Sequence, residues 1–331
     1  MKAVVLESFG GPEVLRVREV PEPQAGPDEV RIRVAATALN RADLMEREGR
    51  YPPPGKPPRF QIPGLEVSGV VDQVGERVTA FQIGDRVMAL LAGGGYAQAV
   101  VSHERLTMPV PDCITLERAA ALPEVFLTAF DALHEQGGAH PGWRILVHAG
   151  ASGVGSAAIQ LARQQGMSVM ATVGSHLKLE AARAFGADRV VNYRQEKFIN
   201  AVEEWTGGVG VDVVIDFIGQ DYLSDNLKAL APGGTLVVVG TLSGAQASLN
   251  LGMVLAKRLR IQGTALRSRP LDLKMALVRR FLREGWGLLA SGSVKPVIDR
   301  VYPLQHVAEA HAYMASNQNI GKIVITVGEL D

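Results

Sequence analysis

The 331-residue sequence has only one cysteine, no excess of charge of either sign and no long apolar run. The single Cys113 excludes an internal disulfide and any metal cluster held by several thiolates. Lys plus Arg and Asp plus Glu each number 34, and this balance argues against broad electrostatic binding to nucleic acid or to a membrane. Because no stretch approaches ~20 uninterrupted apolar residues, no membrane span is expected.

The N-terminus does not have the composition of a secretory signal. Glu7 and Gly10 interrupt it too early for the apolar core of a signal peptide, so the expected location is the cytoplasm. The length suggests two domains rather than one. The 47% hydrophobic content is ordinary for a globular protein with a sizeable core. These properties together are typical of a globular enzyme.

The most informative segment, Arg144–Arg163, predicts a strand, a glycine-rich turn and a helix. Its apolar run Ile145–Val147 suits a buried strand, and helical periodicity follows the glycines. We expect Gly150 to permit the tight turn, Gly153 to let the backbone approach a pyrophosphate, and Gly155 to let the helix pack close to the strand. Amides at the helix N-terminus then face the phosphates of a dinucleotide. The candidate cofactor contacts in this turn are Gly150, Ser152, Gly153, Val154 and Gly155.

Residues 1–124 are predicted to be mostly β. Short runs rich in Val and Ile alternate with Gly and Pro turns, which is typical of a small barrel or sandwich. Five prolines in eight residues make Tyr51–Pro58 a loop, because proline fits neither a helix interior nor a central strand. The expected strands are Ala3–Leu6, Val14–Val20, Val30–Ala36, Val67–Val74, Arg86–Leu90 and Ala97–Val101, with one helix at Arg41–Glu48.

Near residue 117 the pattern changes to alternating strands and helices. Helices are expected from Glu117 and at Val125–Glu135, around a break at Pro123. Further helices are expected near 153–165, 176–185, 195–205 and 221–230. The alternation predicts a parallel sheet with helices on both faces. Its expected strands are Ile145–Val147, Val169–Val173, Val190–Asn192, Val211–Phe217, Thr235–Gly240 and Leu259–Thr264.

The segment after about residue 267 returns to a mixed pattern. The apolar spacing there predicts two helices and two short strands. They are a helix at Leu271–Leu282, a strand at Val294–Ile298, a helix near His306–Ala315 and a last strand at Lys322–Val327.

The end of the second strand of the parallel sheet indicates the cofactor. A site that prefers NAD usually carries Asp or Glu there to bind the ribose 2′-hydroxyl, whereas this chain has Gly174 and Ser175. Lys178 follows at the start of the next helix, and a small hydroxyl plus a cation suits a 2′-phosphate. The sequence therefore predicts NADPH, with Tyr193 as a further contact. The alternatives are a solvated helix lysine at 178 and a half-buried loop aromatic at 193.

Loops at the carboxyl ends of the later strands are also expected to face the ligand, because ligands of such sheets bind there. The alternative for Arg267 is a surface loop. These further candidate contacts are Ile218, Gly219, Gly240, Thr241, Leu242, Leu266 and Arg267, together with Thr128 at the start of the preceding helical region.

Several short motifs carry a family resemblance over essentially the whole chain. They are Ala38-Leu-Asn-Arg-Ala-Asp43, Gly64-Leu-Glu-Val-Ser-Gly69, Ile83-Gly-Asp-Arg-Val87, Leu127-Thr-Ala129, Ala149-Gly-Ala-Ser-Gly-Val-Gly155 and Asn319-Ile-Gly-Lys322. In these motifs the chain resembles the zinc-independent quinone oxidoreductases, the zeta-crystallin-like branch of the medium-chain dehydrogenase/reductase superfamily. Within that branch, three further segments resemble the animal quinone reductases induced by a tumour-suppressor transcription factor: Arg41-Ala-Asp-Leu-Met45, Met88-Ala-Leu-Leu91 and Leu266-Arg-Ser-Arg269.

The resemblance implies an α/β fold in which a Rossmann doubly wound parallel sheet is inserted into a GroES-like, mostly-β catalytic domain. Residues 1–124 and 267–331 then form the catalytic domain and residues 125–266 the NADPH-binding domain, with the active site in the cleft. The resemblance also implies that Asn319 and Lys322 are cofactor contacts near the C-terminus. In relatives the strand corresponding to Leu259–Thr264 pairs with a second subunit, which favours a homodimer or homotetramer.

The positions that bind zinc in the alcohol dehydrogenases of this superfamily are altered. The resemblance places Asn40 at the position of a cysteine ligand, and Gly64-Leu65-Glu66 at that of a Gly-His-Glu motif. Neither an asparagine nor a leucine supplies the thiolate or imidazole that such a site uses. The seven histidines are scattered without metal spacing, and His148 is expected to be a core histidine. We therefore expect no metal, and an acceptor that is already electron-poor, such as a quinone or an activated enone.

Two residues are candidates for holding that acceptor. Asn40 offers an amide donor, and Tyr51 can stack on a ring or donate a hydrogen bond. The alternative for Tyr51 is packing against the loop prolines. Asp43 is expected to cap a helix rather than to act as an acid, and Glu66 to support its neighbours.

Three functions are compatible with the sequence. The first is an NADPH-dependent quinone reductase acting on a small-molecule quinone or another electrophilic acceptor. The second is an enone or enoyl-thioester reductase on the same scaffold. The third is a non-catalytic NADPH-binding protein with a structural or RNA-associated role, although the small basic clusters make nucleic-acid binding the weaker expectation.

Overall fold

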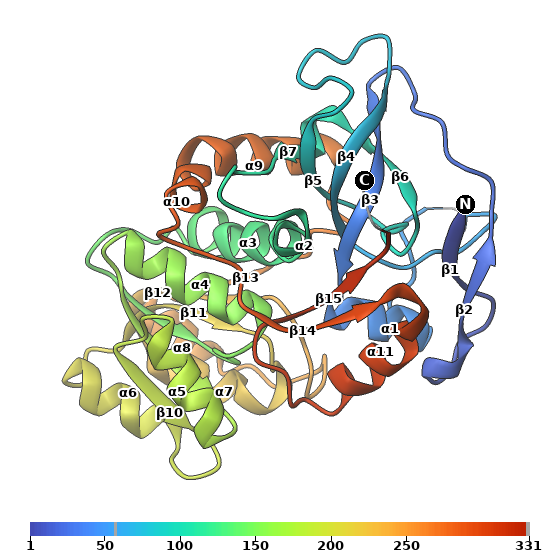
Figure 1. Ribbon diagram of the computed structural model, residues 1–331. Helices are drawn as coiled ribbons and strands as arrows, with labels where there is room; N and C mark the ends of the chain where they lie inside the picture. Colours follow the sequence, from blue (N-terminus) through green and yellow to red (C-terminus); the bar gives the residue numbers. More distant parts are fainter. Residues whose placement is uncertain (56–57, 329–331) are drawn as a thin grey trace. The chain divides into compact units, whose positions relative to one another are not determined.

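The computed structural model describes residues 1–55 and 58–328, so Lys56 and Pro57 of the expected proline-rich loop lie outside the described residues. The chain forms two compact units. Unit 1 consists of residues 1–127 and 266–331, and unit 2 of residues 128–265 (Figure 1). The domain boundaries expected from the sequence were after residues 124 and 266. None of the described helices is long and apolar enough to cross a membrane.

Unit 2 is built on a six-stranded sheet in the order β10-β9-β8-β11-β12-β13, and every neighbouring pair is parallel. Numbered along the unit, this order is 3-2-1-4-5-6, the order of a Rossmann fold. The predicted doubly wound sheet is therefore confirmed. The strands are β8 (Arg144–Val147), β9 (Ser168–Val173), β10 (Arg189–Asn192), β11 (Val211–Asp216), β12 (Leu230–Val238) and β13 (Arg260–Gly263).

The helices of unit 2 pack against this sheet. Leu146, Val214 and Leu236 on the strands form one core with Phe198 and Leu227 on the helices. The central strands are buried along most of their length, which explains why they read as continuous apolar runs. The helices are α4 (Gly153–Gln164), α5 (His176–Ala184), α6 (Phe198–Thr206), α7 (Leu223–Ala229) and α8 (Leu251–Lys257), with a π-helical turn at Asp131–Gln136 and a 3-10 turn at Gln220–Tyr222.

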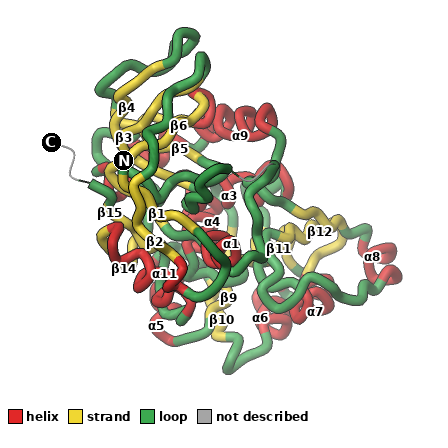
Figure 2. The backbone as a smooth tube through the Cα atoms, turned by 90° about the vertical axis from the view of Figure 1, so that its right-hand side faces the viewer, coloured by secondary structure: helices red, strands yellow, loops and turns green. Residues whose placement is uncertain are grey.

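Unit 1 contains a seven-stranded sheet and a separate β1-β2 pair. Strands from the two ends of the chain meet in the larger sheet: β15 runs antiparallel to β3, with Val324 opposite Ala38 (Figure 2). Apolar residues such as Val34, Val67 and Val87 fill its core. The strands are β1 (Lys2–Leu6), β2 (Leu15–Glu19), β3 (Glu29–Ala38), β4 (Glu66–Val74), β5 (Arg86–Leu90), β6 (Ala99–His103), β7 (Thr107–Pro109), β14 (Ile298–Pro303) and β15 (Lys322–Thr326).

The helices of unit 1 are short, apart from α9. Helix α3 continues from unit 1 into unit 2, because its residues 123–127 belong to the first and 128–130 to the second. The helices are α1 (Arg41–Arg47), α2 (Leu116–Ala119), α3 (Pro123–Phe130), α9 (Leu271–Glu284), α10 (Trp286–Ala290) and α11 (Val307–Ala315), with 3-10 turns at Pro12–Val14, Glu104–Leu106 and Leu304–His306.

The structure differs locally from the prediction in several places, which include the unpredicted strand β7 and helix α10. The strand expected at Val294–Ile298 is wrong, because the strand starts only at Ile298. The Val294 amide instead donates to Leu288 O within α10, and Pro296 has no amide to offer a sheet. Helix α8 was not predicted, because its seven residues are apolar at nearly every position and show no helical alternation, although Met253 and Val254 pack against the core of unit 2.

Candidate functional site

In the glycine-rich turn after β8, the residues have different structural roles from those expected. Its left-handed residue is Ala149, with φ 48°, whereas Gly150 has an ordinary backbone conformation. A Cβ on Gly150 would lie 2.7 Å from the Cβ of Ala171 on β9. The expectation that Gly150 permits the tight turn is therefore wrong, and its lack of a side chain serves close packing. Gly155 fits its prediction, since a Cβ there would lie 2.4 Å from Ala149 O.

The N-terminus of α4 faces outward from this turn. Ser152 is its N-cap, and its hydroxyl accepts the Gly155 amide at 3.0 Å. Ser152, Gly153 and Val154 are all partly exposed. The first amides of a helix have no intrahelical acceptor, so this 12-residue helix presents N–H groups and the positive end of its dipole where phosphates are expected.

The predicted selectivity residues lie together at the end of β9. Ser175 caps α5, and its hydroxyl accepts the Lys178 amide at 3.3 Å. The hydroxyl of Tyr193 lies against Gly174, where a Cβ would come within 2.4 Å of it. The structure thus brings Gly174, Ser175, Lys178 and Tyr193 to one strand end, and none of them is acidic.

The loops after β11 and β12 are held by a residue that sequence reasoning missed. Asp216 is buried at the end of β11, and its carboxylate accepts the amides of Ile218 at 2.8 Å and Gly219 at 3.1 Å. Burial raises the pKa of Asp216 to about 6, although both amides act in the opposite direction. An aspartate that ends an apolar strand just before Phe-Ile-Gly was the available signal.

The two loops lie side by side because their backbones are hydrogen-bonded. The Gly240 amide donates to Asp216 O at 3.2 Å, and the Leu242 amide to Phe217 O at 3.1 Å. Gly219 adopts φ 87° and pairs with Gly244. Thr241 and Leu242 are exposed at this strand end. The predicted contacts after these strands therefore form one continuous rim of unit 2.

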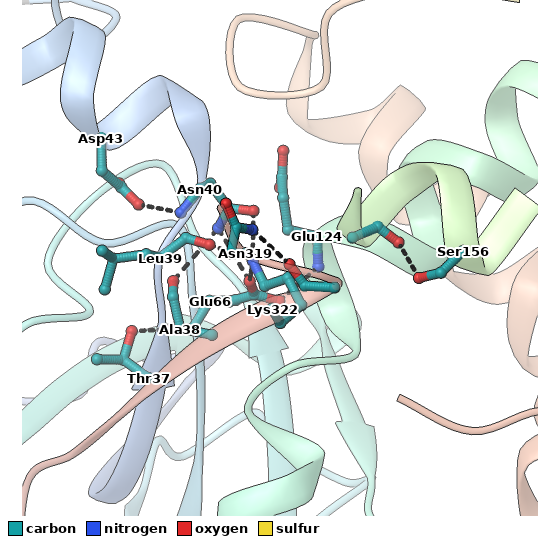
Figure 3. Close-up of polar contacts among 12 residues, drawn as sticks. Thr37, Ala38, Leu39, Asn40, Asp43, Glu66, Glu124, Ser156, Asn319 and Lys322 are labelled. Carbon is teal, nitrogen blue, oxygen red and sulfur yellow. Dashed lines mark hydrogen bonds and ion pairs between the residues drawn. The ribbon is translucent and has the colours of Figure 1, made fainter. Parts of the chain in front are cut away.

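Three predicted residues of unit 1 meet because of sheet register. Val324 opposite Ala38 brings Lys322, at the start of β15, level with Asn40 just beyond β3. On the other side of β3, the β3–β4 register carries Glu66, at the start of β4, to the same end of the sheet. Three polar side chains thus converge at one buried point (Figure 3).

The Lys322 ammonium lies at the centre of this group. It is 2.6 Å from Asn40 Oδ1, 2.7 Å from Glu66 Oε1 and 2.5 Å from Leu39 O. Asn40 also donates through Nδ2 to Glu66 Oε1 at 2.9 Å and to Ala38 O at 3.3 Å. The lysine's three protons and both amide protons of Asn40 are therefore used within unit 1.

Neighbouring carboxyl groups extend this cluster. The second oxygen of Glu66 accepts the Glu124 amide at 2.8 Å, at the first turn of α3. Asp43 accepts the Asn40 amide at 2.7 Å, which bears out the expected capping role. Burial raises the pKa of Asp43 to about 7, against the opposing effect of that amide.

Arg267 is buried rather than part of a surface loop. Its guanidinium pairs with Glu46 at 2.6 Å and donates to Ala92 O at 2.8 Å and Tyr51 O at 3.0 Å. It also lies over the Tyr51 ring, 5.3 Å from its centroid. Arg267 therefore fixes the start of the proline-rich loop. Of the other predicted contacts, Leu266 and Thr128 are buried, and Asn319 donates to Gly321 O at 2.9 Å.

The residues at the lost ligand positions do not fit zinc. The oxygens of Asn40 and Glu66 that face each other are bridged by the Lys322 ammonium, and a metal ion would have to displace it. Leu65 is buried and apolar. In the part of the chain that the structure describes, no cluster of three His, Cys, Asp or Glu side chains has the arrangement of a metal site.

His148 has the structural role expected of it. It is fully buried, with Nδ1 2.9 Å from Thr172 Oγ1 and Nε2 2.7 Å from Asn226 Oδ1. Burial lowers the pKa of His148 to about 4, so the ring is neutral at pH 7.

Comparison with known proteins finds a matching family model for a segment of each unit. Residues 26–112 match the family model described as the alcohol dehydrogenase GroES-like domain, and residues 153–282 the one described as zinc-binding dehydrogenase. The quinone oxidoreductase of Pseudomonas aeruginosa is 35% identical over 98% of this chain and 99% of its own length. This chain belongs to the quinone oxidoreductase family of the medium-chain dehydrogenase/reductase superfamily.

Solved structures of the superfamily agree with this assignment over the whole chain. Escherichia coli quinone oxidoreductase, determined in complex with NADPH, superposes with a TM-score of 0.88 and 31% identity, covering 99% of this chain and 100% of its own. A structure described as an NAD-dependent alcohol dehydrogenase has a TM-score of 0.86 and 37% identity, covering 99% and 100%. Within this quinone oxidoreductase family member, Glu124 and Asp216 are the site residues that sequence reasoning missed, whereas Arg267 was predicted, but as a cofactor contact or a surface-loop residue.

Proposed function

We propose that this chain is an NADPH-dependent oxidoreductase that reduces quinones without a metal ion. The observation that carries the cofactor choice is the group of Gly174, Ser175, Lys178 and Tyr193 at the end of β9, where a small hydroxyl and a cation replace the acidic residue of an NAD site. Membership of the quinone oxidoreductase family supports the acceptor.

The residues of unit 2 fit a dinucleotide. The close packing at Gly150 and Gly155 leaves the α4 N-terminus open, so its amides can hold the pyrophosphate. The 2′-phosphate is assigned to Ser175 and Lys178, and the nicotinamide half to the rim of Ile218, Gly219 and 240–242, with Thr128, Leu266 and Asn319 as further contacts. NADPH supplies the hydride when bound.

The residues of unit 1 are assigned to the acceptor. Tyr51 presents a partly exposed ring that Arg267 holds in place. The Asn40 side chain is hydrogen-bonded to Lys322 and Glu66, so we assign it a role in positioning these residues rather than in donating its amide protons to the acceptor. We therefore assign residues 125–266 to NADPH binding and residues 1–124 with 267–331 to the acceptor. We also propose a cytoplasmic homo-oligomer that pairs through the β13 edge.

The proposal is tested with an anaerobic panel of quinones, 2-alkenals and enoyl thioesters, with NADPH or NADH and a radical probe. We expect quinone turnover with NADPH. Turnover restricted to alkenals or thioesters would favour an enone reductase, and cofactor binding without any turnover a structural role.

Lys178→Ala tests the cofactor assignment separately. It removes a charge-assisted contact of about 1.5–3 kcal/mol. We expect NADPH to bind roughly tenfold or more weakly, with NADH binding barely changed, in a fluorescence titration. Equal losses for both cofactors would reject the role of Lys178.

A further inference from the structure

The cluster in unit 1 contains one acidic group that the proposed reaction has not yet used. Glu124 is the second residue of α3, and the bond from its amide to Glu66 Oε2 at 2.8 Å fixes its backbone beside Asn40 and Lys322. Its side chain is half-buried. Among the residues that the structure describes, its carboxyl forms no hydrogen bond or ion pair, and no dashed contact reaches it in Figure 3.

The cations nearest Glu124 have other partners, and Lys274 donates to Arg267 O at 3.3 Å. Lys322 uses its protons on Leu39 O, Asn40 Oδ1 and Glu66 Oε1. Arg267 uses its own on Glu46, Ala92 O and Tyr51 O. Within residues 1–55 and 58–328, neither the Glu124 carboxyl nor the Tyr51 hydroxyl has a hydrogen-bond partner, so both can meet a ligand.

Charged and titratable groups from several elements face the Glu124 carboxyl. They are Glu66 on β4, Asp43 on α1, Tyr51 in the loop after α1, Lys322 on β15, Arg267 after β13 and Lys274 on α9.

The two free groups differ in their acidity. Burial, and then the Glu66 charge, raise the pKa of Glu124 to about 8, against the opposing effects of Lys322 and Arg267. Glu124 therefore carries a proton at pH 7. Burial, and then the Glu124 charge, raise the pKa of Tyr51 above its ordinary value. A proton donor works best when its pKa is near the working pH, which favours the carboxyl over the phenol.

We propose that Glu124 is the proton donor to the acceptor, with Tyr51 orienting the acceptor ring. This role rests on the proposed quinone reduction. The quinone receives two electrons and one hydrogen as hydride from NADPH, and the Glu124 O–H bond breaks as the quinone oxygen gains its proton. The products are the hydroquinone, NADP⁺ and the Glu124 carboxylate. Solvent then reprotonates the half-buried carboxylate, with Lys322 and Arg267 stabilising its charge in the interval.

The test is Glu124→Gln. This variant keeps the shape of the side chain and the hydrogen bond from the backbone amide to Glu66, but its side chain cannot release a proton. The matched control is Glu117→Gln, an exposed glutamate on the neighbouring helix α2. Turnover is compared for an alkyl-substituted and a halogen-substituted benzoquinone. We expect kcat of E124Q to fall by about 10²-fold for the alkyl quinone, whose reduced anion is more basic, and by less for the halogenated one. E117Q should match the parent.

Two further measurements separate a proton donor from a structural residue. The parent's kcat should decline above about pH 8 and that of E124Q should not. In cofactor-free protein, infrared titration should show a protonated carboxyl band that persists above pH 7 and is missing in E124Q. NADPH binding should be unchanged.

Equal losses for both quinones, an unchanged pH profile or an unchanged infrared band would overturn the role of Glu124. An active parent with an unaffected E124Q would refute only this role. A parent that binds NADPH but reduces neither quinone would refute the proposed function, and the role with it.

Discussion

Replacing Lys322 with Met tests whether the buried ammonium stabilises unit 1. The lysine is 3% exposed, and it lies within 2.7 Å of Glu66, whose side chain is fully buried. Met preserves most of the aliphatic stem but removes the charge and three hydrogen bonds. Glu66 is then left as a buried carboxylate with only the amides of Asn40 and Glu124 as partners.

Breaking a buried ion pair by removing one partner typically costs about 3–5 kcal/mol, because the other charge stays buried without compensation. We expect Lys322→Met to lose that much free energy of unfolding. The double variant Lys322→Met/Glu66→Gln removes the stranded charge and should recover more than half of the loss. Lys2→Met, an exposed lysine of the same unit, should change stability by less than about 0.5 kcal/mol.

Unfolding of unit 1 can be followed by its own tryptophan. Trp286 lies in unit 1, whereas Trp143 and Trp205 lie in unit 2. Urea titrations are therefore run without cofactor in a Trp143→Phe/Trp205→Phe background. A loss below about 1 kcal/mol for Lys322→Met, or a double variant no more stable than the single one, would refute the reasoning that an unpaired buried charge dominates.

Three further predictions concern the acceptor, metal and pH. Tyr51→Phe should keep most of kcat and Tyr51→Ala should raise KM; a loss of ~10²-fold or more in the Phe variant would make Tyr51 the acid instead. Dialysis against a strong chelator should leave quinone turnover unchanged, and stoichiometric zinc with chelator-sensitive turnover would contradict this. The pKa of His148 is about 4 in the folded protein, below its ordinary value of about 6.5. The contribution of the neutral ring to the free energy of unfolding is therefore complete above pH ~6.5 and falls by roughly 3 kcal/mol as the pH drops toward 4. In urea titrations, His148→Gln should reduce this decline of the free energy of unfolding between pH ~6.5 and 4. An unchanged decline would show that other groups cause it.

The strands of unit 2 could be predicted because strands that are covered on both faces have a simple sequence pattern. Strands such as β8 and β11 are covered on both faces, so apolar residues occupy nearly every position. The glycine-rich turn was recognisable because its glycines follow an apolar strand and precede a helix. The roles of its individual residues were not, because the left-handed conformation of Ala149 and the close approach of β9 to Gly150 are tertiary features.

The polar cluster of unit 1 could be named only in part. Asn40 and Lys322 are separated by most of the chain, and only the pairing of β15 with β3 brings them together. No local pattern encodes that register. A signal did exist, since Glu66 is a charge at the first position of the buried first half of β4, and Lys322 is a charge at the first position of the largely apolar β15. Such a charge requires a partner, although the sequence does not say which one.

The ammonium at this point also limits the chemistry available to unit 1. A zinc ion would polarise a carbonyl oxygen by accepting its lone pair. Lys322 cannot substitute for it, because all three of its protons are held by Leu39 O, Asn40 and Glu66. The cluster therefore stabilises its own carboxylate rather than the charge that develops on an acceptor. Under the proposed assignment, an acceptor bound here must already be electron-poor, and unit 1 would orient it and deliver a proton. A quinone meets that requirement, whereas an unactivated carbonyl does not.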